Sequence, residues 1–281
     1  MTVSRVATKP QVTALLKHPE QRVAPSPVTS GEVLLRDTDS AAPVALVLKA
    51  PQDLTEACRD LFRSTDFSMG VRRVNGLANE SQTFGYTQPN ALRRRYAPTT
   101  SRFAIKNAAG HALLEDAATW YADALGRHLP DIASHARAVT ADVDAQWQLG
   151  RSWWTSGIVN KNTPLMYHRD ASNHPAWSAM LVTRWGMRGG HLHIADYDIT
   201  LECADGHVVY FAGYELVHAV TPFRASLKGA YRYSAVYYPI RYFAKAGTYD
   251  DALSRGRTRE TGMADGLVER QAGMGLIEQG S

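Results

Sequence analysis

Cysteine is scarce in this sequence, which has only Cys58 and Cys203 among its 281 residues. Two scattered thiols cannot build a disulfide framework or a thiolate zinc site, so we expect a reducing, cytoplasmic setting. Long apolar runs are lacking as well, because no segment approaches the ~18 apolar residues of a membrane-spanning helix. Residues 1–10 contain no apolar core of a signal peptide. These absences predict a protein that is neither secreted nor inserted in a membrane.

A strong excess of one charge is also missing, since 31 basic residues stand against 27 acidic ones and leave a formal net charge of +4. This small excess permits nucleic-acid binding without requiring it. The length and the apolar content of 44% suit one large globular domain, with or without an appendage. We predict an N-terminal arm with a small hairpin over residues 1–50, a main domain over 51–245 and a polar tail over 246–281.

The spacing of apolar residues changes near residue 150. Before it, helical spacing predicts helices over 54–62, 111–129 and 132–139. After it, short β-branched and aromatic segments bounded by Gly or Pro predict strands, which are 165–170, 177–185, 191–194, 199–203, 207–211, 216–221 and 231–240. Short strands of this kind are typical of a cupin-like jelly roll, or double-stranded β-helix, here with its core at about 150–242. We therefore predict an α+β fold whose jelly roll is braced by helices from the N-terminal half.

Two histidines and one aspartate form the main candidate site. His168 and Asp170 are two residues apart, so on a strand their side chains point to the same face. A third ligand must come from another strand, and His218 lies near the start of one. Two imidazoles and one carboxylate form the facial triad that holds non-haem Fe(II) and leaves coordination positions open. We predict a metal centre at His168, Asp170 and His218, which are then also the catalytic residues.

An arginine and a serine on the last predicted strand form a second candidate site. Arg232 and Ser234 share a face of that strand. A guanidinium fork with a hydroxyl beside it suits a carboxylate bound through two hydrogen bonds in a dry pocket. Arg224 competes for this role, but it follows Pro222 on a predicted turn, so we favour Arg232.

Other motifs compete with these sites. His191 and His193 could offer a cupin-type metal two imidazoles, but they follow a Gly-Gly turn on a predicted outer strand, and we expect them to be solvent-exposed. His174 is expected to be a loop residue rather than a fourth ligand. A protein kinase is excluded, because the residue five positions after Asp170 is Pro175 where the kinase loop needs Asn, and no Gly-rich loop is present.

The ordered set of His-x-Asp, a distant His and Arg-x-Ser resembles the Fe(II)/2-oxoglutarate dioxygenases. The resemblance implies the double-stranded β-helix fold and the use of Fe(II), 2-oxoglutarate and O2. It implies that Arg232 and Ser234 bind the distal carboxylate of 2-oxoglutarate. The implied reaction couples decarboxylation of 2-oxoglutarate to succinate with hydroxylation of a C–H bond. Asp170 favours hydroxylation, because halogenating members of the superfamily carry a small residue at that position.

The similarity is greater to one branch, the ten-eleven-translocation (TET) and base J-binding enzymes with their bacterial and phage relatives. These enzymes oxidise the 5-methyl group of pyrimidines in DNA. The similarity covers roughly residues 70–242, and it rests on three motifs and two weaker matches: His168-Arg169-Asp170-x-x-Asn173, His218-Ala219-Val220-Thr221-Pro222 and Arg232-x-Ser234-x-Val236-x-Tyr238, with Arg72-Arg73 and Thr83-Phe84-Gly85 further upstream.

The resemblance implies substrate contacts as well. Asn173 would hydrogen-bond the target base and Tyr238 would stack on it, in keeping with extrusion of the base from its duplex before oxidation. Arg72 would contact the other carboxylate of 2-oxoglutarate. Arg94 and Arg95 lie in the densest basic run of the chain, and we expect them to contact DNA phosphates.

Two departures from the TET pattern leave the target base open. The chain lacks the Cys-rich zinc region, and Ile240 occupies the position of a base-contacting His. DNA with 5-methylcytosine, thymine or another modified pyrimidine is therefore the expected partner. A hydroxylase of a free nucleotide, amino acid or other small metabolite is the first alternative, and a binding module without activity is the second. The resemblance implies a cytoplasmic protein of a bacterium or of a phage in a bacterial host, and the pattern is compatible with a monomer.

Overall fold

The computed structural model describes residues 1–17, 28–67, 69–71, 78–89, 98–252 and 254–255. Its helices are α1 (Lys9–Lys17), α2 (Gln52–Ser64), α3 (Arg102–Lys106), α4 (Ala108–His128) and α5 (Pro130–Val139), with the 3-10 turns η2 (Ala145–Trp147) and η3 (Arg241–Lys245). The helices predicted over 54–62, 111–129 and 132–139 correspond to α2, α4 and α5. Among the described residues, no helix is long and apolar enough to cross a lipid bilayer.

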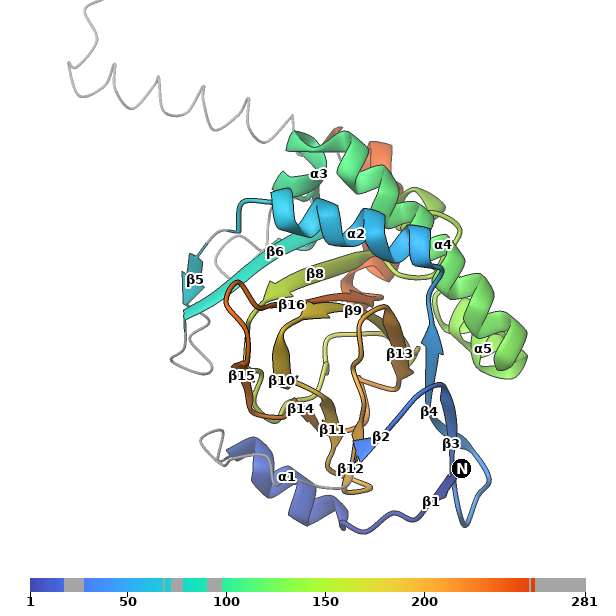
Figure 1. The fold of residues 1–281 in the computed structure, drawn as a ribbon. Coiled ribbons are helices and arrows are strands. Elements are labelled where there is room, and N and C mark those ends of the chain that lie inside the picture. The colour runs from blue at the N-terminus through green and yellow to red at the C-terminus, as the bar shows by residue number, and fades with distance from the viewer. Residues whose placement is uncertain (18–27, 68, 72–77, 90–97, 253, 256–281) are drawn as a thin grey trace, which may run out of the picture.

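A large, mostly antiparallel sheet forms one wall of the molecule (Figure 1). Its strands follow the order β1-β3-β4-β13-β9-β16-β8-β6-β5, and β7 pairs with β6 off this path. Their bounds are β1 (Thr2–Val3), β3 (Val33–Asp37), β4 (Pro43–Lys49), β5 (Met69–Val71), β6 (Ala78–Thr87), β7 (Thr99–Thr100), β8 (Ser156–Lys161), β9 (Ser178–Trp185), β13 (His207–Phe211) and β16 (Tyr231–Tyr238).

A smaller sheet lies across the barrel from the central strands of the large one (Figure 1). Its order is β14-β11-β12-β2, with bounds β2 (Val28–Thr29), β11 (Leu192–Ile194), β12 (Ile199–Leu201) and β14 (His218–Val220). The ribbon of β10 (Met187–Gly189) and β15 (Phe223–Ala225) continues from this sheet. The two facing sheets make a double-stranded β-helix, so the predicted α+β fold is confirmed.

Helices from the N-terminal half cover the outer face of the large sheet, as predicted. One side of α4 is buried against the sheet, and the Tyr210 hydroxyl of β13 donates to the Tyr121 carbonyl of α4 at 3.1 Å. The rings of Tyr121 and Tyr237, on β16, lie 5.3 Å apart. Side-chain caps begin two of the helices, because Ser101 accepts the amide of Ala104 and Asn107 accepts the amide of Gly110. These contacts fix the sheet that carries the candidate site.

The N-terminal segment is more ordered than the sequence indicated. The sequence predicted an arm before the hairpin, whereas β1 pairs with β3 and α1 packs beneath the small sheet. The predicted hairpin forms from β3 and β4, and β4 pairs with β13, so the hairpin extends the large sheet. The division of the chain at residues 50 and 245 stays a prediction.

Candidate metal centre and co-substrate pocket

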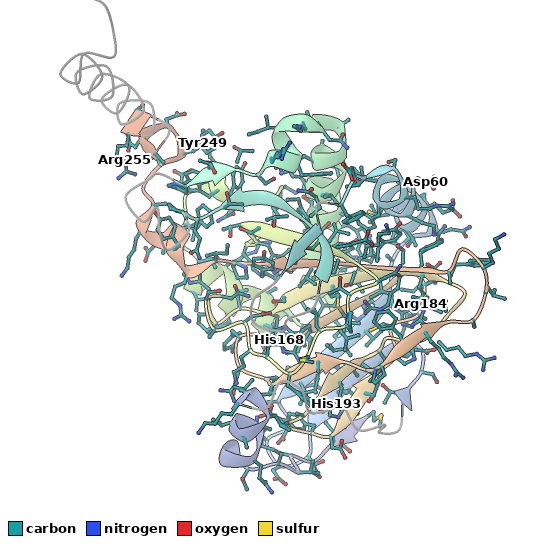
Figure 2. The ribbon with its side chains drawn as sticks, turned by 90° about the vertical axis from the view of Figure 1, so that its left-hand side faces the viewer. Asp60, His168, Arg184, His193, Tyr249 and Arg255 are labelled. Carbon is teal, nitrogen blue, oxygen red and sulfur yellow. The ribbon has the colours of Figure 1, made fainter. Side chains whose placement is uncertain are left out.

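Three predicted ligands meet between the two sheets. One ligand atom of each of His168, Asp170 and His218 lies within 4.8 Å of the others. The Nε2 atom of His168 is 3.8 Å from Asp170 Oδ1, and the Nε2 atom of His218 is 4.0 Å from Asp170 Oδ2. Figure 2 shows His168 near the centre of the molecule. The sequence thus brings together two imidazoles and a carboxylate, the donor set that suits Fe(II).

The backbone that carries His168 and Asp170 is not the strand predicted over 165–170. His168 instead forms an isolated bridge with His218, in which each amide donates to the other's carbonyl at 2.9 and 3.0 Å. The amide of Asp170 donates to the Gly213 carbonyl at 2.9 Å. Two separate backbone attachments therefore replace strand alternation as the cause of their convergence. The strand prediction was wrong because pairing here is limited to a single residue.

Backbone carbonyls orient both imidazoles. The Nδ1 atom of His168 lies 2.7 Å from the Met166 carbonyl, and that of His218 lies 2.9 Å from the Leu216 carbonyl. With Nδ1–H donating, each Nε2 presents its lone pair to the space beside Asp170, as in metal sites whose outer contacts fix the tautomer. Burial, together with the neighbouring His168, holds the pKa of His218 well below its ordinary value, so this imidazole is neutral at pH 7.

Gly213 makes room for the carboxylate of Asp170. A Cβ added at Gly213 would lie 2.7 Å from Asp170 Oδ2, closer than real Cβ atoms approach an oxygen. The same residue supplies the carbonyl that holds the Asp170 amide. Gly213 is thus a positioning residue that the sequence analysis missed, since a lone glycine before a predicted strand indicates only a turn.

Arg232 is completely buried, and its guanidinium lies beside Ser234 and the Cys203 thiol. Its Nε donates to the Gly190 carbonyl at 2.8 Å and its Nη1 to the Ser234 hydroxyl at 3.3 Å. Its Nη2 has no hydrogen-bond partner among the described residues. Burial lowers the pKa of Arg232, but an arginine remains protonated at pH 7. Arg224 is exposed and lies opposite Arg188 in the β10–β15 ribbon, so the geometry favours Arg232.

One cavity of about 300 Å³ extends from the candidate metal ligands to Ser234, the partner of Arg232, and Arg232 itself is not among its lining residues. Its lining includes the three candidate ligands and Ser234, and the predicted substrate residues Asn173 and Tyr238 form part of its wall. Ile240 also lines it, where the resemblance places a base-contacting His in TET enzymes. Gln88 is a further polar residue in the lining that the sequence analysis did not name.

Asn160 is a second residue that the sequence analysis missed. It lies on β8 opposite Ser234 of β16, is 1% exposed and lines the cavity. Neither its amide nitrogen nor its amide oxygen has a hydrogen-bond partner in the described part of the chain. Buried polar groups are normally paired, so the unpaired amide of Asn160 indicates a place where a polar ligand could bind. Its signal in the sequence was an Asn in a strand, where Asn is uncommon.

The expected exposure of His191 and His193 is not what the structure shows. His193 was expected in solvent, but it is 3% exposed, with Nδ1 3.1 Å from the Tyr167 hydroxyl and Nε2 3.0 Å from Asp198. His191 is half-buried, and its Nδ1 accepts the Cys203 amide at 3.2 Å. The burial follows from pairing of β11 on both sides. His174 is buried outside the cavity lining, and Arg72, Arg94 and Arg95 lie outside the described residues.

No family model and no curated protein matches the sequence. Among solved structures, NgTET1 in complex with 5mC DNA is similar, with a TM-score of 0.58 and 15% identity over 90% of this chain and 100% of that chain. An oxidoreductase of the 2OG-Fe(II) oxygenase family from Burkholderia pseudomallei has a TM-score of 0.44 and 12% identity, over 85% of this chain and 95% of that chain. OsALKBH1 has a TM-score of 0.42 and 12% identity, over 74% of this chain and 99% of that chain.

The first of these likenesses shows the fold, a double-stranded β-helix. The His-x-Asp…His set between the two sheets resembles the metal site of the Fe(II)/2-oxoglutarate oxygenases, and the completely buried Arg232 contacts Ser234 of the cavity wall. The donor set fits Fe(II), and a buried guanidinium that contacts the Ser234 hydroxyl, with Nη2 unpaired among the described residues, fits a carboxylate of 2-oxoglutarate. The sequence motifs around the site resemble those of the TET branch of that class.

Proposed function

We propose that this protein is an Fe(II)- and 2-oxoglutarate-dependent dioxygenase that hydroxylates the 5-methyl group of a pyrimidine in DNA. The observation that carries the first part is a cavity lined by a two-His, one-carboxylate set and by Ser234, which a completely buried arginine contacts. The Nη2 atom of that arginine is unpaired among the described residues. His168, Asp170 and His218 would hold the iron. Bound iron would supply O2 activation driven by decarboxylation of 2-oxoglutarate, with hydroxylation of a C–H bond.

The chain's own residues would bind and orient the reactants. Arg232 and Ser234 would hold the distal carboxylate of 2-oxoglutarate, because a guanidinium with one free nitrogen beside a hydroxyl can form two charge-assisted hydrogen bonds. Asn160, opposite Ser234, would donate its amide N–H to the same co-substrate. The apolar lining from Met180, Phe211 and other residues would exclude water from the reacting atoms.

A base in DNA is the proposed substrate because Asn173 and Tyr238 line the same cavity as the candidate ligands. An enzyme that oxidises a base must take it out of the stack, then contact its edge and its face. An amide side chain and a phenol ring supply these two contacts. NgTET1, whose structure contains 5mC DNA, has the same fold, which supports this choice. Ile240 in the lining offers no hydrogen bond, so 5-methylcytosine and thymine both remain candidates.

Mass spectrometry of nucleosides tests the proposal. DNA that contains 5-methylcytosine or only the four ordinary bases is incubated with protein, Fe(II), 2-oxoglutarate and ascorbate, and succinate is measured in parallel. We expect a hydroxymethyl nucleoside and an equivalent amount of succinate. Oxidation of free nucleotides or amino acids as fast as of DNA would favour the small-metabolite alternative. If no succinate forms in an iron-dependent way with any substrate, the result would favour a binding module without activity.

Two variants separate the iron site from the substrate site. His218→Ala should abolish succinate formation with and without DNA, because it removes a ligand. Tyr238→Leu should lower DNA oxidation far more than it lowers the uncoupled turnover of 2-oxoglutarate, because it removes ~1–3 kcal/mol of base stacking. Equal losses in both assays for Tyr238→Leu would contradict the stacking role.

A further inference from the structure

The N-terminal segment lies directly behind the metal centre. Figure 1 shows α1 alongside β11, β12 and β14, on the outer side of the small sheet. Val12 of α1 is 1% exposed and packs in one cluster with Tyr167 and Val217. These two residues immediately precede the candidate ligands His168 and His218. We call residues 5–16 the N-terminal strap.

Asp196 connects the strap to the backbone that carries His218. Arg5 Nη1 donates to Asp196 Oδ1 at 3.0 Å, and the amides of Val6 and Ala7 donate to the Asp196 carbonyl at 3.1 and 3.3 Å. The other carboxylate oxygen of Asp196 accepts the amide of Val217 at 2.9 Å. The Asp196 side chain is 3% exposed, so a buried carboxylate has the strap on one side and the ligand segment on the other.

The Asp196 carboxylate holds the amide of Val217, which lies between Leu216 and the candidate ligand His218. Leu216, before Val217, supplies the carbonyl that orients the His218 imidazole, and His218 itself follows Val217. The Val217 carbonyl in turn accepts the amide of Ala195 at 2.9 Å. Both backbone groups of Val217 are therefore held from the strap side of the sheet.

A second line of contacts reaches His168. The Tyr167 hydroxyl lies 3.1 Å from His193 Nδ1, and His193 Nε2 lies 3.0 Å from Asp198. The Tyr167 ring packs in the same cluster as Val12. In Figure 2, His193 lies on the side of His168 where α1 and the small sheet are found. The strap thus contacts the chain neighbours of both histidine ligands.

We infer that the strap positions His168 and His218 for metal binding, so that its docking and metal occupancy are coupled. Arg5, Val12 and Asp196 are then positioning residues. The inference rests on the proposed metal centre. Partners beyond the first ligands typically change metal affinity about 10–100-fold when they are removed. Arg5 acts on the ligands only through Asp196 and Val217. We therefore expect its removal to lower metal affinity by about tenfold, the lower end of that range. By reciprocity, bound metal must favour the docked strap by the same factor.

Titration with Co(II) tests the inference without any oxidation reaction. The variants are Arg5→Ala and Arg5→Lys, and the matched control is Arg151→Ala, which removes a surface ion pair to Asp123 away from the site. We expect Arg5→Ala to weaken Co(II) binding about tenfold and to change the visible Co(II) spectrum. Arg5→Lys should restore most of the affinity, and Arg151→Ala should bind like the wild type. Thermal unfolding of the metal-free proteins shows how far each variant alters stability alone.

Hydrogen exchange on the wild-type protein gives a readout that needs no variant. The amides of Val6 and Ala7 should exchange about tenfold more slowly with Co(II) bound, while the Asp37 amide in the β3–β4 hairpin keeps its rate. Co(II) affinity of Arg5→Ala within twofold of Arg151→Ala, with unchanged exchange at residues 6 and 7, overturns the strap inference alone. Wild-type protein that binds Co(II) no more tightly than His218→Ala overturns the metal centre, and the strap inference with it.

Discussion

Replacement of Arg232 by lysine tests the co-substrate site most directly. The guanidinium is completely buried, with Nε bound to the Gly190 carbonyl, Nη1 to the Ser234 hydroxyl and Nη2 unpaired among the described residues. A lysine keeps the positive charge but has one nitrogen on a flexible stem. It cannot hold the Gly190 carbonyl, the Ser234 hydroxyl and both oxygens of a carboxylate in one plane.

The hydrogen bonds that a lysine cannot make set the size of the effect. A hydrogen bond to a charged group contributes about 1.5–3 kcal/mol, and 1.4 kcal/mol corresponds to a tenfold change in a dissociation constant. Removal of one of the two proposed bonds from Arg232 to the carboxylate should therefore raise the dissociation constant of 2-oxoglutarate about 10- to 100-fold. The contact is distant from the reacting atoms, so the turnover rate at saturating 2-oxoglutarate should fall much less than the affinity.

Succinate formation measured against 2-oxoglutarate concentration gives both quantities, and calorimetry with Co(II)-loaded protein gives the affinity without turnover. Arg224→Ala is the matched control, because Arg224 is exposed on β15 and was the competing candidate. It should behave like the wild type. Thermal unfolding of Arg232→Lys excludes a loss of fold. Unchanged 2-oxoglutarate affinity in Arg232→Lys, with lost affinity in Arg224→Ala, would move the carboxylate site to Arg224.

The same geometry supports three further predictions. Asp170→Ala should abolish hydroxylation and weaken Co(II) binding at least tenfold by titration, because two imidazoles alone hold a divalent ion poorly; retained hydroxylation would remove Asp170 from the ligand set. Gly213→Ala should also weaken Co(II) binding, since its Cβ would lie 2.7 Å from Asp170 Oδ2, whereas Gly126→Ala, with 3.8 Å to its nearest neighbour, should not. Burial lowers the pKa of His174 and His191 in the native protein. As the pH falls through the ordinary histidine pKa of 6.5, these residues are therefore protonated in the unfolded chain before they are protonated in the native protein. Metal-free protein should therefore lose thermal stability as the pH falls below about 6.5, and a flat profile would show that these histidines are protonated in the native state.

The sequence predicted the elements whose apolar pattern is strong within a short window. The strand at β13 was predicted with its observed bounds, and β9 and α4 to within a few residues, because β-branched or helically spaced residues mark them. The strand β8 was not singled out, since Ser, Gly and Asn occupy half of it. Its strand conformation comes from pairing with β6 and β16, far away in the sequence. Such partners cannot be read from a local window.

The candidate site shows the same division. His168, Asp170, His218 and Arg232 were found because their chemistry and order are visible in the chain. The convergence of His168 and Asp170 was predicted for the wrong reason, since it depends on a single-residue bridge and on the Gly213 carbonyl. Asn160, Gly213 and Asp196 were missed because their roles exist only through contacts between distant segments. A buried asparagine or aspartate looks in sequence like any turn residue.

Among the described residues, Arg232 and Asn160 have buried polar atoms without a hydrogen-bond partner. A buried guanidinium nitrogen and a buried amide with neither end paired each cost free energy, commonly ~1–3 kcal/mol for a group left unsatisfied. Asp196 and His193, which are also buried, both have hydrogen-bond partners at each end. Arg232 and Asn160 instead both neighbour Ser234, on adjacent strands, and Asn160 and Ser234 line the cavity. Unsatisfied groups that gather in one place are expected where a ligand completes them. The carboxylate of the proposed 2-oxoglutarate would supply acceptors for Arg232 Nη2 and for the Asn160 amide nitrogen, so its binding would add to the stability of this wall.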